Sequence, residues 1–253
     1  MLISSNLLNF VLRNGDDRLI LSHRLAELCG HAPILEEDIA LTNIALDVLG
    51  QAILFYKYAA ELENNGKTED YYAYKRNERE FKNLLLVEQP NEDFAYVIAR
   101  QFYFDTYEYF FYEELINSKD KQISAIAEKS IKETKYHLRH SSQWMLYLGD
   151  GTEESHNRLT NACNYLWMYT GEMFQNQDED LPLIEQGIIP DLNKIKPKWI
   201  DAVSKVKEEA QLGKYDPNSF MQKGGRLGNH TEYLGHILSE MQYLTRAYPE
   251  AKW

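Results

Sequence analysis

The seven histidines are the side chains of this sequence best suited to hold a metal or to move a proton near neutral pH. Metal centres in helical bundles use the motif Glu-x-x-His, because the i, i+3 spacing directs both side chains at one metal. Three positions before the histidines stand, in order, Ile20, Leu28, Thr134, His137, Glu153, Leu227 and Tyr233. Only Glu153 with His156 matches, at a predicted helix start where an acid favours the helix dipole and the histidine is solvated. The sequence therefore predicts no pair of Glu-x-x-His motifs.

Four polar residues still fall on faces that predicted helices would bury. Glu133 and His137 share one stripe of a predicted helix, at 100° per residue. Asp105 lies on the apolar face of another predicted helix, and Asp47 is the only charge in a long apolar run. Asp17, in the first predicted helix, is a further candidate that the pattern does not place.

This set supplies three carboxylates and one histidine, whereas a di-iron centre uses about four carboxylates and two histidines. We interpret Asp47, Asp105, Glu133 and His137 as a vestigial polar cluster whose members hydrogen-bond one another in a core layer. We therefore expect no catalytic, cofactor-binding or metal-binding residues in this chain. A working metal site with an unconventional ligand set remains the alternative.

Other chemistries find less support in the sequence. No serine has the pattern of a nucleophile elbow, and neither Cys29 nor Cys163 has the context of a nucleophile or a zinc ligand. The glycine cluster at residues 224–228 lacks the strand that precedes a phosphate-binding loop, so we interpret it as a flexible hinge.

Helices must position these residues, because apolar residues recur with helical spacing and Gly and Pro together number only 20. The predicted helices cover residues 16–29, about 36–63, 92–117, 122–148, 153–176, 199–212 and 231–247. Residues 67–93 are predicted to form an irregular connection and residues 181–197 a loop. We predict a single all-α domain over residues 1–253, with a four-helix bundle at about 16–148 and accessory helices at about 153–247.

Composition narrows the classes of partner. The net charge of −12 argues against binding to nucleic acid or to an anionic membrane. Two cysteines are too few for a disulfide framework, and the N-terminal residues lack a signal-peptide pattern, so we expect a cytoplasmic protein. The apolar run Ile39–Tyr56 approaches the length of a membrane span, but Asn43, Asp47 and Gln51 place a polar line along one side. A central bundle helix explains this pattern better than a membrane span.

Four segments carry a resemblance to a known family. They are GDDRLILSHRLAELCGHAPILEEDIALTNIALDVLGQA (15–52), NEREFKNLLLVEQPN (77–91), IKETKYHLRHSSQWMLYLGDGT (131–152) and GGRLGNHTEYLGHILSEMQYL (224–244). In colinear order, and with the terminal Trp253, they resemble the structural subunits (PaaC type) of phenylacetyl-CoA 1,2-epoxidases. The resemblance implies a ferritin-like fold over nearly the whole chain and a scaffolding role that is not catalytic alone.

The resemblance also implies partners and cofactors outside this chain. A homologous catalytic subunit would hold a di-iron centre, a small subunit would bridge, and a reductase would carry flavin, an iron–sulfur cluster and NADPH. The complex would use oxygen to epoxidise the ring of phenylacetyl-CoA during aerobic phenylacetate degradation.

The far side of the third predicted helix (Phe102, Tyr103, Phe110 and Phe111) is the expected docking face, which the isolated chain can use to form a homodimer. Two alternatives remain: a genuine di-iron oxidase or hydroxylase, and a helical interaction module with no redox role. Iron content, measured for the chain alone and beside a catalytic partner, separates them.

Overall fold

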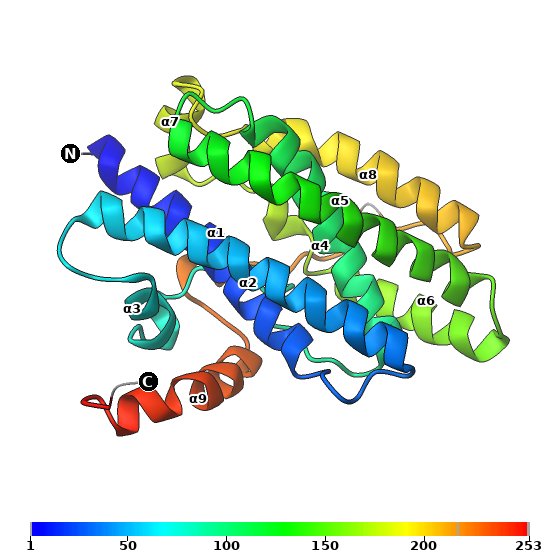
Figure 1. Cartoon of the computed structure of the whole chain (residues 1–253). Helices are drawn as coiled ribbons and strands as arrows, with labels where there is room; N and C mark the ends of the chain where they lie inside the picture. Colours follow the sequence, from blue (N-terminus) through cyan, green and yellow to red (C-terminus); the bar gives the residue numbers. More distant parts are fainter. Residues whose placement is uncertain (1, 217, 252–253) are drawn as a thin grey trace. The chain divides into compact units, whose positions relative to one another are not determined.

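The computed structural model describes residues 2–216 and 218–251, which contain α-helices, short 3₁₀ helices and no strand (Figure 1). The α-helices are α1 (Leu2–Ala26), α2 (Leu35–Glu63), α3 (Glu69–Tyr74), α4 (Phe94–Leu115), α5 (Lys121–Gly149), α6 (Glu153–Trp167), α7 (Leu181–Glu185), α8 (Leu192–Glu209) and α9 (Glu232–Ala247). The 3₁₀ helices are η1 (Glu78–Glu80), η2 (Gly171–Phe174), η3 (Asp178–Asp180) and η4 (Gly225–Leu227). The expected all-α, ferritin-like fold class is confirmed.

The chain divides into two compact units. The N-terminal unit comprises Met1–Pro90 and Gly224–Trp253, and the central unit comprises Asn91–Lys223. The last helix, α9, therefore packs with the N-terminal residues of the chain rather than with the helices that precede it in sequence.

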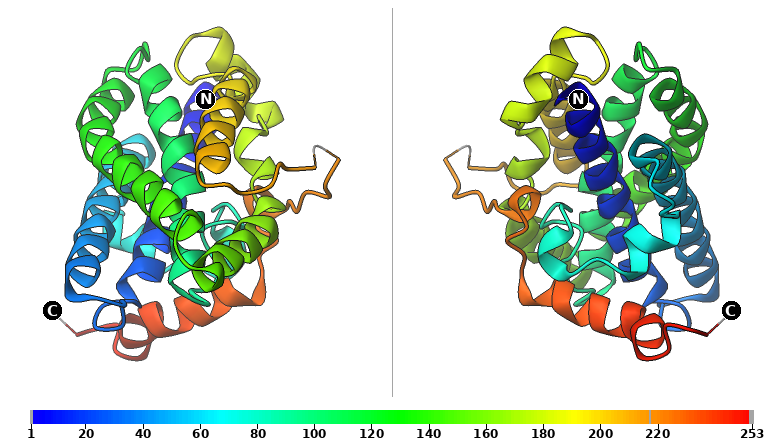
Figure 2. Two further views of the ribbon diagram at one scale, coloured as in Figure 1. Left: turned by 90° about the vertical axis from the view of Figure 1, so that its right-hand side faces the viewer. Right: turned by 90° about the vertical axis from the view of Figure 1, so that its left-hand side faces the viewer.

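In the N-terminal unit, α1 and α2 form a long helix pair, and α9 runs crosswise to them (Figure 2). Helix α1 begins at Leu2, so the prediction that it begins at residue 16 was wrong. Gly15 lies inside α1, where a Cβ would come within 2.5 Å of the Tyr56 ring. The glycine thus allows α1 and α2 to approach closely, and this contact outweighs its low helix propensity.

Helix α2 ends as predicted at Glu63, and Asn64 closes it in the left-handed conformation. By length and composition α2 could cross a membrane, and 44% of its most apolar stretch is buried within the chain. Gln51, from the polar line of this helix, is buried, whereas Asn43 is exposed.

In the central unit, α4 is surrounded by α5, α6 and α8. Phe102, Tyr103 and Phe111 are fully buried, and Phe110 is half-buried. The prediction that this aromatic side of α4 is a docking face was therefore wrong. Three helices of the same unit, α5, α6 and α8, pack against α4. The large side chains of α4 therefore point to more than one side of the helix and are still buried.

Two other helix boundaries differ from the predictions. Helix α6 ends at Trp167 rather than near residue 176, and the 3₁₀ helix η2 follows it from Gly171. A Cβ at Gly171 would overlap the Met221 side chain. Helix α8 begins at Leu192, inside the predicted loop, where the Asp191 side chain accepts a hydrogen bond from the amide of Asn193. Pro197 is accommodated within this helix.

The close approach at Gly15 yields a test. Gly15→Ala should destabilise the chain by about 1–3 kcal/mol, because the new methyl group overlaps the ring of the buried Tyr56. Gly50→Ala in α2 is the matched control: nothing lies within 4 Å of a Cβ there, so a gain of up to about 1 kcal/mol is expected. Urea unfolding measures both, and equal effects at the two positions would contradict the explanation.

Candidate functional site

A layer of polar side chains lies inside the central unit, between α4 and α5. Asp105 and Glu108 from α4 and His137 and Ser141 from α5 are all fully buried. Gln101 Nε2 donates a hydrogen bond of 2.6 Å to Asp105 Oδ1, and Ser141 Oγ donates one of 2.8 Å to Asp105 Oδ2. Both oxygens of the Asp105 carboxyl group are thus held by neutral donors of their own unit.

The electrostatics of this layer favour a protonated carboxyl group. Burial raises the pKa of Asp105 to about 7, and the nearby Glu108 adds to the shift. His137 and the hydrogen bonds from Ser141 and Gln101 act in the opposite direction and reduce it. The layer can therefore bind or release a proton near neutral pH, which is the chemistry that its residues support.

The donor set of the layer does not fit a di-iron centre. Within the described residues, no three side chains of His, Cys, Asp or Glu lie close enough together to hold a metal ion. The two Asp105 oxygens are already engaged with Gln101 and Ser141, and His137 follows Thr134 at the i−3 position instead of a glutamate. Such a centre would need about four carboxylates and two histidines.

The four residues of the predicted polar cluster have different surroundings. Asp105 and His137 are buried in the central unit, close enough for the His137 charge to affect the Asp105 carboxyl group. Glu133 is half-buried one turn before His137 on α5. Asp47 is half-buried on α2, in the N-terminal unit. The structure thus brings Asp105 and His137 together, and it adds Gln101 and Ser141.

A second set of buried charges lies in the N-terminal unit, around α1. Asp17, which the sequence did not place, accepts two hydrogen bonds from the guanidinium of Arg226, of 2.9 and 2.8 Å. The side chains of Arg226 and Asp17 are 7% and 1% exposed. Asp17 also accepts from the amide of Leu84, and Arg226 donates to the carbonyl of Lys82.

Arg226 belongs to the glycine cluster at 224–228, which begins where the N-terminal unit resumes after the central unit. That this cluster is a flexible hinge stays a prediction. Gly224 and Gly228 have φ angles of 138° and 80°, which favour glycine, and they flank the turn that carries Arg226. A Cβ at Gly228 would also overlap the carbonyl oxygen of Arg79. The glycines therefore allow the backbone to come close enough for Arg226 to reach Asp17.

Asp16 forms the neighbouring ion pair with Arg76. Asp16 also accepts hydrogen bonds from the Tyr56 hydroxyl, at 2.6 Å, and from the amide of Lys82, at 2.8 Å. The partners of Asp16 come from α2 and from the connection between α3 and α4. Together, Asp16 and Asp17 therefore link α1 to α2, to this connection and to the glycine cluster at 224–228. The sequence did not reveal this network, because its members are far apart in the chain and no local pattern links them.

A further buried carboxylate of this unit, Glu88, lies beside His230. One imidazole nitrogen lies 3.3 Å from Glu88 Oε1 and the other 2.9 Å from the carbonyl oxygen of Phe81. Both neighbours are acceptors, so the doubly protonated imidazolium fits best. Although burial alone would lower the pKa of His230, the hydrogen bond and charge of Glu88 raise it. Thr231, at the start of α9, donates its amide and its hydroxyl to Glu88.

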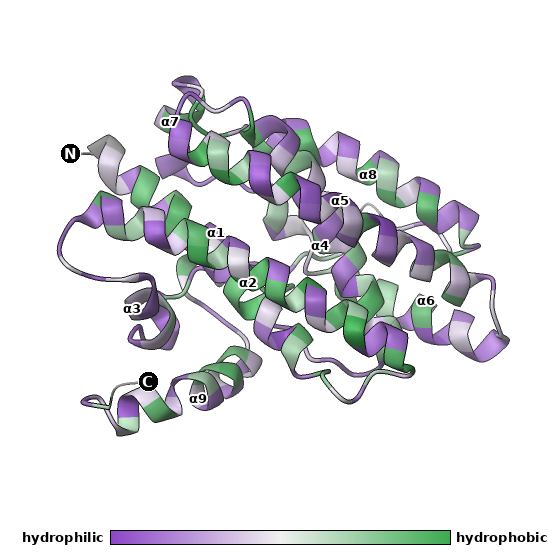
Figure 3. Ribbon diagram, in the orientation of Figure 1, coloured by the Kyte–Doolittle hydropathy of each residue, from purple (hydrophilic) through white to green (hydrophobic). Residues whose placement is uncertain are grey.

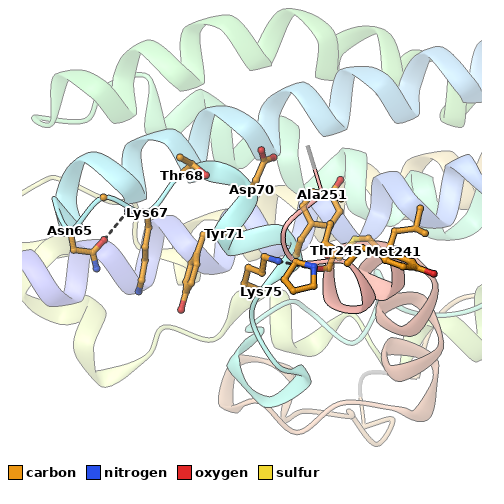
Figure 4. Close-up of a pocket in the computed structure, with 14 residues that line it drawn as sticks. Asn65, Lys67, Thr68, Asp70, Tyr71, Lys75, Met241, Thr245 and Ala251 are labelled. Atoms are coloured by element: carbon orange, nitrogen blue, oxygen red, sulfur yellow. Dashed lines mark hydrogen bonds between the residues drawn. The ribbon is translucent and has the colours of Figure 1, made fainter. Parts of the chain in front are cut away.

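A surface pocket of about 780 Å³ lies in the same unit, between α3 with its preceding loop and α9 (Figure 4). Tyr71 and Lys67 line it, with the Lys67 ammonium 4.5 Å from the Tyr71 ring and 2.8 Å from the carboxylate of Glu63. Lys75 crosses the pocket to donate a hydrogen bond to the carbonyl of Thr245. Both lysines are engaged within the chain, and the described lining offers no arrangement of nucleophile and base.

The buried ion pair of Asp17 and Arg226 can be tested by a double-mutant cycle. Arg226→Met leaves the Asp17 carboxylate buried without its counter-charge and should cost about 3–5 kcal/mol of stability. Asp17→Asn keeps an acceptor for the Leu84 amide, so the double variant should recover at least about 1 kcal/mol of that loss. Urea unfolding of the unsubstituted chain, the two single variants and the double variant measures the coupling free energy. If the losses of stability of the two single variants simply add up in the double variant, Asp17 and Arg226 are not coupled.

The buried Asp105 predicts a specific pH dependence. Its folded-state pKa of about 7 lies above the unfolded value, so the folded chain binds the extra proton between about pH 4 and pH 7. The stability from this proton is complete below the unfolded pKa and is lost as the pH rises towards 7. Asp105→Asn removes this loss, because the amide stays neutral.

Relative to the unsubstituted chain, the stability of Asp105→Asn should therefore increase between pH 5 and pH 8 by roughly 1–3 kcal/mol. Asp201→Asn, at an exposed position of α8, is the control for removing one carboxylate. Thermal unfolding at both pH values measures the difference. A stability difference independent of pH would contradict a protonated Asp105.

Comparison with known proteins identifies the family of the chain. Residues 3–253 match the model of the family described as phenylacetic acid catabolic protein (PaaA_PaaC). The chain is 47% identical, over 244 residues, to a protein of Escherichia coli (strain K12) that is named as a subunit of 1,2-phenylacetyl-CoA epoxidase. The alignment covers 96% of this chain and 98% of that protein. The chain belongs to the phenylacetic acid catabolic protein family.

Proposed function

We propose that this chain is the structural subunit of a multicomponent oxygenase that epoxidises the aromatic ring of phenylacetyl-CoA. The observation that carries the proposal is the identity of 47% to a protein named as one subunit of such an epoxidase, over nearly the full length of both chains. A protein named as one subunit works with others, so the proposed role includes partner chains.

In the proposed reaction, dioxygen, NADPH and one proton are consumed and NADP⁺ is released, so NADPH supplies two electrons together with the second proton. One oxygen atom forms the epoxide across a ring bond and the other leaves as water. We assign the di-iron centre to a homologous catalytic subunit, and the flavin and iron–sulfur cluster to a reductase, with a small subunit that bridges. The cell compartment that fits is the cytoplasm, because Cys29 and Cys163 are free thiols.

The polar layer of the central unit supports a role that is not catalytic. Asp105 engages both oxygens with neutral donors, and the described layer offers two carboxyl groups, Asp105 and Glu108, and one histidine, His137. A di-iron centre uses about four carboxylates and two histidines. The layer stabilises the pairing of α4 and α5 through hydrogen bonds instead. The chain then contributes a rigid helical body on which the catalytic subunit is held.

Iron content and turnover test the assignment together. The chain purified alone should hold no stoichiometric iron, and coexpression with the other subunits encoded beside it should give a complex that forms epoxide with NADPH and oxygen. Asp105→Asn and Glu133→Ala should leave turnover per assembled complex within about twofold, because neither side chain contacts a reacting atom.

Elemental analysis and product assay per intact complex provide the measurements. About two irons per chain with oxygen consumption by the chain alone would instead establish a di-iron oxidase with an unconventional ligand set. Loss of most activity in a well-assembled Asp105→Asn complex would likewise show that the polar layer takes part in the chemistry.

A further inference from the structure

The outward side of α2 carries a line of apolar side chains that the rest of the described chain leaves open. Leu35, Ile39 and Leu46 are 71%, 55% and 60% exposed, and Ile53 is half-buried on the same line. At 100° per residue these positions, together with Gly50, fall within a sector of about 60°. We call these five residues the α2 stripe. Hydrophobic turns recur along this helix in Figure 3.

The stripe is unusual for the exposed side of a helix. The opposite side of α2 packs on α1, with buried side chains such as Ile44 and Val48. A surface helix with one face buried normally presents charged and polar residues to water on the other. On the stripe, the first charged residue is Lys57, beyond Ile53. Over the first five turns of α2, the stripe therefore carries no charge, as is typical of a helix surface that is covered by another element.

Gly50 is an independent observation at the same place. Glycine inside a helix costs about 1 kcal/mol relative to alanine. A Cβ at Gly50 would meet nothing within 4 Å, and its φ is not in the left-handed region, so nothing in the described chain requires a glycine there. It leaves a notch between Leu46 and Ile53, and a missing side chain lets a second helix approach more closely.

We propose that the α2 stripe is the docking surface for a long helix of a non-identical subunit, with an apolar side chain of that helix seated at Gly50. This inference rests on the proposed function, because it names a partner surface of the same complex. Leu35, Ile39, Leu46 and Ile53 are spaced by four, seven and seven residues, as in a heptad pattern, which suits a helix crossing at a shallow angle. The stripe extends over roughly 27 Å, at 1.5 Å per residue.

The surroundings of the stripe favour a different subunit over a second copy. The net charge of −12 makes self-association unfavourable, and Glu36 and Asp38 lie beside the stripe. The relative in Escherichia coli is itself named as one subunit of an epoxidase. An apolar centre flanked by polar residues such as Asn43 and Lys57 also has the usual anatomy of a protein interface.

The test compares exposed positions within and outside the stripe. Ile39→Asp and Leu46→Asp should weaken binding to the coexpressed remaining subunits at least 100-fold, because each buries a charge at the centre of the contact. Ile200→Asp, at a 41% exposed apolar position of α8, is the matched control and should change the Kd less than about threefold. Binding is measured by interferometry, and the melting temperature of each isolated chain confirms folding.

Gly50 separates the stripe from a general effect of charge. Gly50→Ala should keep most of the binding, whereas Gly50→Trp fills the notch and should lose it without unfolding the chain, because open space lies in front of this position. If an aspartate variant does not fold, Asn43→Arg carries the same test, because that position is already polar and exposed.

Each other outcome overturns the inference. Unchanged Kd values for the stripe variants in an active epoxidase complex would exclude this surface while leaving the proposed function intact. Failure of the unsubstituted chain to bind the other subunits would remove both. A dimer in sedimentation that Leu46→Asp dissociates would identify a second copy as the occupant, and co-flotation with phosphatidylcholine vesicles that Leu46→Asp abolishes would identify a membrane.

Discussion

The N-terminal unit depends on one constraint: α1 buries two adjacent aspartates, and each must find a cation in the interior. Asp17 is paired with Arg226 and Asp16 with Arg76. A buried carboxylate without a partner is costly, so these pairs determine where the connecting segment after α3 and the turn before α9 can lie. Residues more than 200 positions apart in the sequence are thereby held in one compact body.

Asp105 of the central unit has different partners. Its carboxyl group accepts hydrogen bonds from the neutral donors Gln101 and Ser141, and burial raises its pKa to about 7. Burial also raises the pKa of Asp17, but there the charge and the hydrogen bonds of Arg226 act in the opposite direction. The polar layer around Asp105 can therefore hold a proton near neutral pH. The same residue type therefore serves as the anchor of a salt bridge in one unit and as a hydrogen-bonding group in the other, and the number of nearby cations decides which.

The proposed role of a structural subunit agrees with these two arrangements. Buried charges that are paired across distant segments favour one conformation of the helices, while the aromatic side chains around α4 complete the core. In the proposed complex, the apolar residues of the α2 stripe, with Gly50 between them, lie against another subunit.

The fold class, the ends of α2 and α9 and the family could be predicted from the sequence, because helical periodicity and residue order are local or colinear properties. The lack of paired Glu-x-x-His motifs could also be read from it. The extent of α1 could not, because it depends on a tertiary contact of Gly15 with Tyr56 that outweighs the low helix propensity of glycine. The start of α8 is a local feature, the cap that Asp191 forms on the amide of Asn193, and the prediction of a loop at residues 181–197 overlooked it.

The pairing of buried charges was likewise decided only by the tertiary structure. Asp17 and Arg226 are separated by most of the chain, and no pattern in the residues around either one indicates that it pairs with the other. The sequence predicts an exposed aromatic face on α4, whereas three helices of the same unit cover it. The sequence does not show how many helices surround α4, because that number depends on the packing of the whole unit. Burial depends on neighbours distant in sequence, and a periodic pattern shows only that a face is apolar, not what covers it.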